Sequence, residues 1–95
     1  MDHRIEHQPA GHKGAFVWLQ DGEKLAEMTY SVAGSRGIIG HTDVDGRLRG
    51  QGAGRQLVKS AVEWARTEKV KLMPLCPFAK SVFDKTPEYR DVLAA

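Results

Sequence analysis

The sequence has little that would mark an oxidising or membrane environment. Cys76 is the one cysteine in 95 residues, so no internal disulfide is possible, and a lone cysteine is typical of a reducing compartment. No apolar run approaches the roughly 20 residues of a membrane span. The polar stretch 1–14 has no apolar core of the kind found in signal peptides. We therefore expect a cytoplasmic protein that does not bind a membrane.

Charge and aromatic content are modest as well. The net charge is +2, which can attract a small anion but does not by itself indicate nucleic acid binding. Aromatic residues make up 7% of the chain, too few to suggest a platform for stacking bases. The length predicts one domain, 1–95, in which 1–14 is a short strand or a flexible arm. The histidines of that arm match no metal-site spacing and are expected to be solvated: His3, His7 and His12.

Alternation with a period of two predicts three short strands. The apolar run 16–20 ends at Asp21-Gly22, and Asp-Gly between apolar runs is a strong hairpin signal. The stretch 24–32 alternates as a half-buried strand does, with one face formed by Ala26, Met28, Tyr30 and Val32. A turn at 34–37 leads to a third strand at 38–44. Three such strands predict an antiparallel meander.

The second half of the chain changes to helical periodicity. Apolar residues recur at helical spacing between Gly50 and about Lys69, which predicts an amphipathic helix. A fourth strand at 70–75 should lie parallel to the third, because such crossovers are right-handed. Pro77 suits the first position of a helix that Thr86-Pro87 ends, and 88–93 is a last short segment. The fold class is therefore α+β: a meander, a β-α-β unit and short C-terminal helices.

The stretch between the third strand and the long helix is rich in glycine and arginine. Gly50, Gly52 and Gly54 alternate at a helix start, where unpaired N–H groups favour an anion. Arg47, Arg49 and Arg55 add positive charge. A P-loop needs Lys-Ser or Lys-Thr after the last glycine, and the dinucleotide pattern needs glycine at 55, so neither pattern matches.

A known family does match. Arg49-x-x-Gly52-x-Gly54 resembles the Arg/Gln-x-x-Gly-x-Gly/Ala signature of the GNAT N-acetyltransferases, with the expected strand before it and helix after it. The stretches 41–52 and 74–78 are similar to those of small single-domain members, and the resemblance extends over roughly residues 15–93.

The resemblance implies a binding mode for acetyl-coenzyme A. The pyrophosphate would lie on the amides of Arg49, Gly50, Gln51, Gly52, Ala53, Gly54 and Arg55. The pantetheine arm would run between the splayed strands 38–44 and 70–75, pairing with the backbone of Thr42, Asp43 and Val44. Pro74 fits a missing ladder bond at the splay, since proline has no N–H.

Two side chains are candidates for catalysis. Cys76 follows a predicted parallel strand and precedes the helix start at Pro77, a position that can lower the pKa of a thiol. It would accept the acetyl group covalently or lie beside a direct transfer. His41, on the neighbouring strand, would act as general base or orient a thiolate. A structural role is the alternative for each residue.

Three functions stay open at this point. The first is an N-acetyltransferase with an unknown amine acceptor, a protein or a small molecule. The second is a non-catalytic coenzyme A binding or sensing module, because Asp21-Gly22 replaces the helices that larger members carry between their first strands. The third is a nucleic-acid or acidic-protein binder, which the sequence favours least, so no nucleic-acid partner is predicted. A free sheet edge would permit a monomer or a weak dimer.

Overall fold

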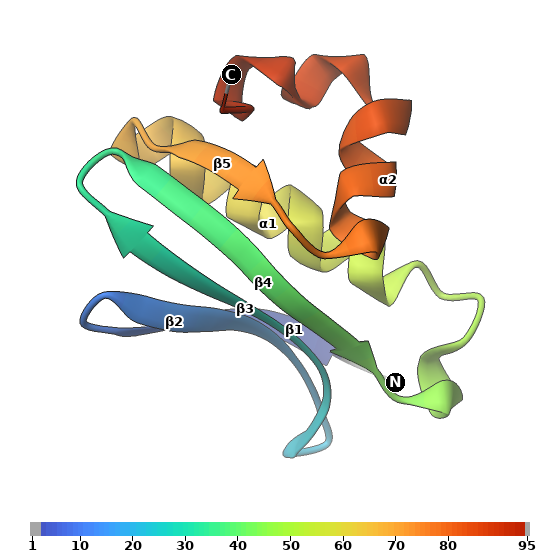
Figure 1. The fold of residues 1–95 in the computed structure, drawn as a ribbon. Coiled ribbons are helices and arrows are strands. Elements are labelled where there is room, and N and C mark those ends of the chain that lie inside the picture. Colours follow the sequence, from blue (N-terminus) through green and yellow to red (C-terminus); the bar gives the residue numbers. More distant parts are fainter. Residues whose placement is uncertain (1–2, 95) are drawn as a thin grey trace.

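The computed structural model describes residues 3–94, which form one mixed sheet of five strands with helices on one of its faces (Figure 1). The strands lie in sequence order across the sheet. The elements are β1 His3–Ala10, β2 Lys13–Gln20, β3 Glu23–Ala33, β4 Arg36–Val44, α1 Ala53–Glu68, β5 Lys71–Pro74 and α2 Pro77–Lys85, with short 3-10 turns at Gly46–Leu48 and Pro87–Val92.

The N-terminal stretch is a strand over residues 3–10, which is the first of the two alternatives predicted for 1–14. β1 pairs along its whole length with β2, from His3 opposite Gln20 to Ala10 opposite Lys13. Two of its histidines pack on aromatic rings: the His3 ring stacks on Trp18 at 3.7 Å between centroids, and the His7 ring stacks on Phe16 at 4.3 Å. His7 is half-buried, so the prediction of a solvated histidine is wrong for it, whereas His3 stacks on Trp18 and stays exposed.

The predicted meander is confirmed and gains β1 as a fourth antiparallel strand. Asp21 and Gly22 both have positive φ, 52° and 79°, as the two-residue hairpin turn requires. The predicted turn at 34–37 is shorter, because Arg36 and Gly37 already belong to β4.

The long helix α1 crosses behind the sheet and closes the core. Its apolar stripe is buried, as the periodicity predicts: Leu57, Val58, Ala61, Val62 and Ala65. The strands meet this stripe with alternate residues such as Phe16, Met28 and Ile39. The opposite face of the sheet carries no helix (Figure 1). We call it the open face.

The parallel pair β4 and β5 is short. Its register runs from Arg36 opposite Lys71 to Ile39 opposite Pro74, and one further bond joins Leu75 N–H to the Ile39 carbonyl. β4 continues five residues beyond this point, to Val44, paired only with β3. The register between β3 and β4 shifts at the same place, so that Gly40 is an extra residue in a β-bulge. The predicted splay, with Pro74 at its start, is confirmed.

The C-terminal part packs beside β5. α2 begins at Pro77 and ends before Thr86-Pro87, as predicted, and the chain then returns so that Ala94 N–H donates to the Leu72 carbonyl. Within residues 3–94, no helix is both long and apolar enough to cross a bilayer.

Candidate functional site

The splay leaves part of a strand's backbone without a ladder partner. Beyond Ile39, the peptide groups of β4 that point toward β5 find no strand, since β5 ends at Pro74 and the chain turns into α2. Peptide groups in this position need partners, because a buried unpaired N–H or C=O costs free energy. An extended ligand with amide groups of its own can supply them. Thr42, Asp43 and Val44 lie on this segment, where the sequence placed them.

Thr42 and Cys76 meet inside the splay. Burial by itself raises the pKa of the Cys76 thiol, but the backbone N–H of Ala79, the Thr42 hydroxyl and the N–H groups of Phe78 and Thr42 point at the sulfur and bring the pKa below its ordinary value. These contacts to the sulfur are weaker than full hydrogen bonds. The Cys76 side chain does not cap α2 by a hydrogen bond, and Thr42 Oγ1 is a buried oxygen without a hydrogen-bond partner among the described residues. The site thus places a thiol whose pKa is lowered beside a hydroxyl that has no hydrogen-bond partner within residues 3–94.

The loop before α1 has the open backbone that an anion requires. Gly50 and Gly52 have positive φ, 81° and 69°, and a Cβ built on either would meet no atom within 4 Å. Glycine is needed here for the left-handed conformation, and the space beside it is free. No side chain caps the N-terminus of α1, and no acidic residue lies in its first turn. The first N–H groups of this helix therefore have no partner within it.

Gly54 has a packing role that the sequence did not show. A Cβ at Gly54 would lie 2.6 Å from two atoms of the Phe78 ring, so the missing side chain makes room for α2 to pack on α1. Gly54 is buried, whereas the Phe78 ring is 41% exposed and extends beside the loop. The missing side chain at Gly54 thus serves this packing, and the contact of its N–H with phosphate stays a prediction. Phe78 was missed, because the contact joins residues far apart in the sequence.

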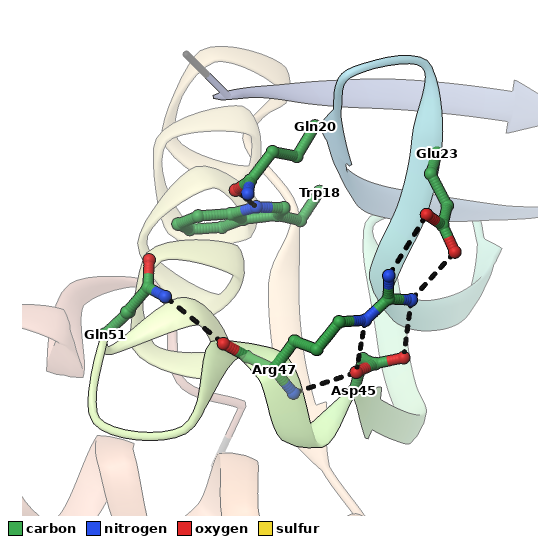
Figure 2. Close-up of polar contacts among 6 residues, drawn as sticks. All are labelled: Trp18, Gln20, Glu23, Asp45, Arg47 and Gln51. Atoms are coloured by element: carbon green, nitrogen blue, oxygen red, sulfur yellow. Dashed lines mark hydrogen bonds and ion pairs between the residues drawn. The ribbon is translucent and has the colours of Figure 1, made fainter. Parts of the chain in front are cut away.

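Arg47 is not available to an anion. Figure 2 shows its guanidinium between two carboxylates: its Nη2 lies 2.7 Å from Glu23 Oε2 and its Nε lies 3.0 Å from Asp45 Oδ1. The hydrogen bonds from Arg47 hold the pKa of Asp45 at about 2 and also lower the pKa of Glu23. The expectation that Arg47 adds free charge to the loop is wrong. Part of this arrangement could be predicted from the sequence, since the side chain of an aspartate often accepts a hydrogen bond from the backbone N–H two residues later, as Asp45 does from Arg47.

Arg49 and Arg55 keep their charge exposed. Neither makes an ion pair within residues 3–94, and they flank the turn that carries Gly50, Gln51 and Gly52. Gln51 supports this turn, because its side-chain amide donates to the Arg47 carbonyl at 3.3 Å (Figure 2). The loop therefore combines open amides with two free cations.

His41 lies on the other side of the sheet from Cys76. It pairs with Thr29 across β3, whereas Thr42 pairs with Met28, a fully buried core residue. Since successive strand residues point to opposite faces, His41 projects from the open face with Asp43. The structure thus brings Thr42 and Cys76 together and keeps His41 apart from both.

Comparisons with known proteins agree with this geometry. The family model described as GCN5-related N-acetyl-transferase matches residues 15–92. Among solved structures, a GCN5-like protein from Staphylococcus aureus, a candidate N-acetyltransferase, is 36% identical, with a TM-score of 0.72 over 95% of this chain and 88% of its own. A search of curated proteins found no match.

More distant structures share the fold alone. The ribosomal-protein-S18-alanine N-acetyltransferase from Escherichia coli is 18% identical, with a TM-score of 0.70 over 81% of this chain and 53% of its own length. A streptothricin acetyltransferase from Bacillus anthracis, solved in complex with acetyl coenzyme A, has a TM-score of 0.58 and 18% identity over 68% of this chain and 39% of its own. This chain thus spans about half the length of the first of these enzymes, or less for the second.

Proposed function

The chain belongs to the GCN5-related N-acetyltransferase family, and on that premise we propose that it binds acetyl-coenzyme A and transfers the acetyl group to an amine. One observation carries the proposal. The segment 40–44 of β4, which has no strand partner on its β5 side, leads from the thiol of Cys76 toward the open amides at Gly50 and Gly52. One ligand could thus find amide partners along this segment and an anion site in the loop that follows it.

The residues present fit the cofactor part by part. The α1 N-terminus with Arg49 and Arg55 would hold the pyrophosphate, because helix dipole, free N–H groups and guanidinium charge all favour an anion there. The backbone of 42–44 would pair with the pantetheine amides. Phe78 would cover the arm from the side of α2. When bound, acetyl-coenzyme A supplies an acetyl thioester.

Two routes of transfer are compatible with the splay. In direct transfer the neutral amine attacks the acetyl carbon, the N–C bond forms, the C–S bond breaks and coenzyme A leaves as its thiol after taking up a proton. His41 is placed to accept the proton that the amine loses, since it lies on the open face. In the covalent route the Cys76 sulfur attacks the acetyl carbon, the donor C–S bond breaks and coenzyme A leaves as its thiol; the amine then attacks the new thioester, and the Cys76 thiol is restored as the N–C bond forms. The lowered pKa of Cys76 favours the thiolate needed for the first step.

Calorimetric titration with acetyl-coenzyme A tests the binding part. We expect Arg49→Gln to weaken binding by about tenfold, because a charge-assisted contact to phosphate contributes about 1.5 kcal/mol. The matched control is Arg47→Gln, two residues away, whose charge is already compensated by Asp45 and Glu23. Arg47→Gln should change the affinity for acetyl-coenzyme A by no more than about twofold, which corresponds to less free energy than an exposed ion pair can contribute.

Intact mass and a panel of amines then test the transfer. Acetyl release that depends on an amine supports an enzyme, and an adduct on Cys76 that the amine discharges supports the covalent route. Tight binding without any amine-dependent release would replace this proposal by the coenzyme A binding module. If the folded wild type binds no acetyl-coenzyme A, the loop before α1 does not bind the cofactor's pyrophosphate and the proposal fails.

A further inference from the structure

The open face of the sheet carries a hollow that the cofactor site does not use. It has a volume of about 320 Å³ and lies between the start of β4, the end of β3 and the first residues of β2. Its floor is apolar: Ile38 and Met73 pair across β4 and β5 and are 38% and 37% exposed. Val32, Ala33 and Ala94 add to the apolar part of the lining, and His12, Lys13, Ser31, Arg36 and Gly37 form the rest. An apolar hollow of this size with few polar groups is typical of a small-molecule site.

This hollow leads to the place where the strands part. Ile38 alternates with the core residue Ile39, so it points away from α1 and lies one position before the last ladder pair. A second hollow of about 290 Å³ shares Lys13, Ser31 and Ile38 with the first and ends at Gly40, the bulge residue. The two form a continuous depression from the hairpin end of the face to the splay. A molecule lying in it would have one end at the proposed site of acetyl transfer.

Charge differs between the two ends of the depression. At the far end Lys13 and Arg36 border the hollow, and neither makes an ion pair within residues 3–94. At the splay end Glu27 lies directly opposite Asp43 on the face that carries His41. Glu27 is already paired with Lys24 at 3.3 Å, whereas Asp43 makes no ion pair within residues 3–94 and is the carboxylate left for a further cation at this end. The depression therefore complements a molecule that is cationic at one end, apolar in the middle and anionic at the other.

We propose that the depression is the acceptor site and that the acceptor is an amine with an apolar body and a carboxylate at its far end. This inference rests on the proposed acetyl transfer. The carboxylate lies at Lys13 and Arg36, the apolar body on Ile38 and Met73, and the amine near Gly40. From Arg36 to Gly40 the strand spans about 13 Å at the usual rise per residue, a length that an extended eight-carbon amino acid nearly reaches. Lysine-rich and polyamine acceptors, cationic at the far end, are disfavoured.

Three amines of equal length test the substrate class: 8-aminooctanoate, octylamine and 1,8-diaminooctane. We expect 8-aminooctanoate to be acetylated with a kcat/KM about two- to fivefold above octylamine, the effect of one partly exposed ion pair, and further above the diamine. Arg36→Gln should remove this advantage and leave octylamine unchanged. Arg4→Gln is the matched control, since Arg4 is an exposed arginine of β1 paired with Glu6. A preference for the diamine, or an equal loss for all three amines in Arg36→Gln, would overturn the proposal.

Octanoate alone tests the hollow without any acetyl transfer. Titration followed by methyl NMR should shift the signals of Ile38 and Met73 in the wild type and in Arg4→Gln, and much less in Arg36→Gln. If these shifts occur but no amine is acetylated, the hollow stands as a carboxylate site and the transferase proposal fails. If acetyl transfer is found but octanoate leaves both methyl signals unmoved, the acceptor site proposed here is refuted while the transferase stands.

Discussion

Replacing Gly54 by alanine would test how the signature loop is built. A Cβ at this position would lie 2.6 Å from the Phe78 ring, closer than real Cβ atoms approach a neighbour. The new methyl group therefore forces α2 or its ring to move. If the glycine instead serves to admit phosphate, as the signature alone suggests, the substitution would leave the stability unchanged and lower only the affinity for acetyl-coenzyme A.

The size of the effect follows from two opposing contributions. Overpacking a well-filled contact costs about 1–3 kcal/mol. The lower half of that range applies, because Phe78 is 41% exposed and its ring can swing outward. Alanine is also about 1 kcal/mol better than glycine inside a helix, although position 54 lies in the first turn, where that gain is smaller. We therefore expect Gly54→Ala to lower the free energy of unfolding by about 1 kcal/mol.

A double-mutant cycle in urea isolates the contact. Phe78→Ala removes the ring, so Gly54→Ala in that background should stop destabilising and become neutral or stabilising, with a coupling energy of about 1–2 kcal/mol. Circular dichroism follows unfolding, and acetyl-coenzyme A titration on the same variants follows binding. Additive effects on stability, together with a loss of cofactor affinity that Phe78→Ala does not relieve, would show that the packing argument is wrong.

Three further predictions concern the thiol, the β1 strand and the loop. Iodoacetamide should alkylate Cys76 at lower pH than a free cysteine, and Thr42→Val should move the midpoint of the rate upward, because the hydroxyl is one of the groups that lower the pKa. Burial lowers the pKa of His7, and the charge of Glu68 partly opposes this effect. The unfolded chain therefore binds the proton more readily, and the free energy of unfolding should fall as the pH drops through about 6.5. Urea unfolding at several pH values should show this fall, and His7→Phe should reduce it. Gly52→Ala must adopt a φ near 69° and should cost about 1–2 kcal/mol in unfolding experiments, with Gly46→Ala, where φ is not positive, as control.

Most of the fold could be predicted because its signals are local. The Asp21-Gly22 turn, the apolar stripe of α1 and the proline that begins α2 each depend on residues within a few positions of one another. β1 was the exception. Its histidines have no apolar alternation, and what holds them is distant: the His7 ring lies on Phe16, and its Nε2 meets Tyr30 Oη at 2.5 Å. Gly14 permits that bond, since a Cβ there would clash with the tyrosine hydroxyl.

The candidate site divides in the same way. The splay after Ile39 was predicted, but the missing N–H of Pro74 does not cause it. Lys71 and Leu75 donate on the β4 side, so the nitrogen of Pro74, one residue before Leu75, faces away from β4. The open backbone of Gly50 and Gly52 follows from glycine in a loop before a helix. The compensation of Arg47 by Glu23 and the filling of the space at Gly54 join positions 24 residues apart in each case. The number of arginines and glycines in the sequence therefore overestimates how many residues of the loop are available to an anion. Two arginines and two glycines remain available to it.

The placement of His41 shows how one step along a strand decides a mechanism. Next to each other in the sequence, His41 and Thr42 point to opposite faces, because the period of a strand is two. Thr42 thereby joins Cys76 on the cofactor side, while His41 joins Glu27 and Asp43 on the open face. A histidine that activated the thiol would have to lie with Thr42. The groups that lower the pKa of Cys76 are therefore backbone N–H groups and the Thr42 hydroxyl, and a base at His41 can serve only a molecule that arrives from the open face, which is where the proposed acceptor depression lies.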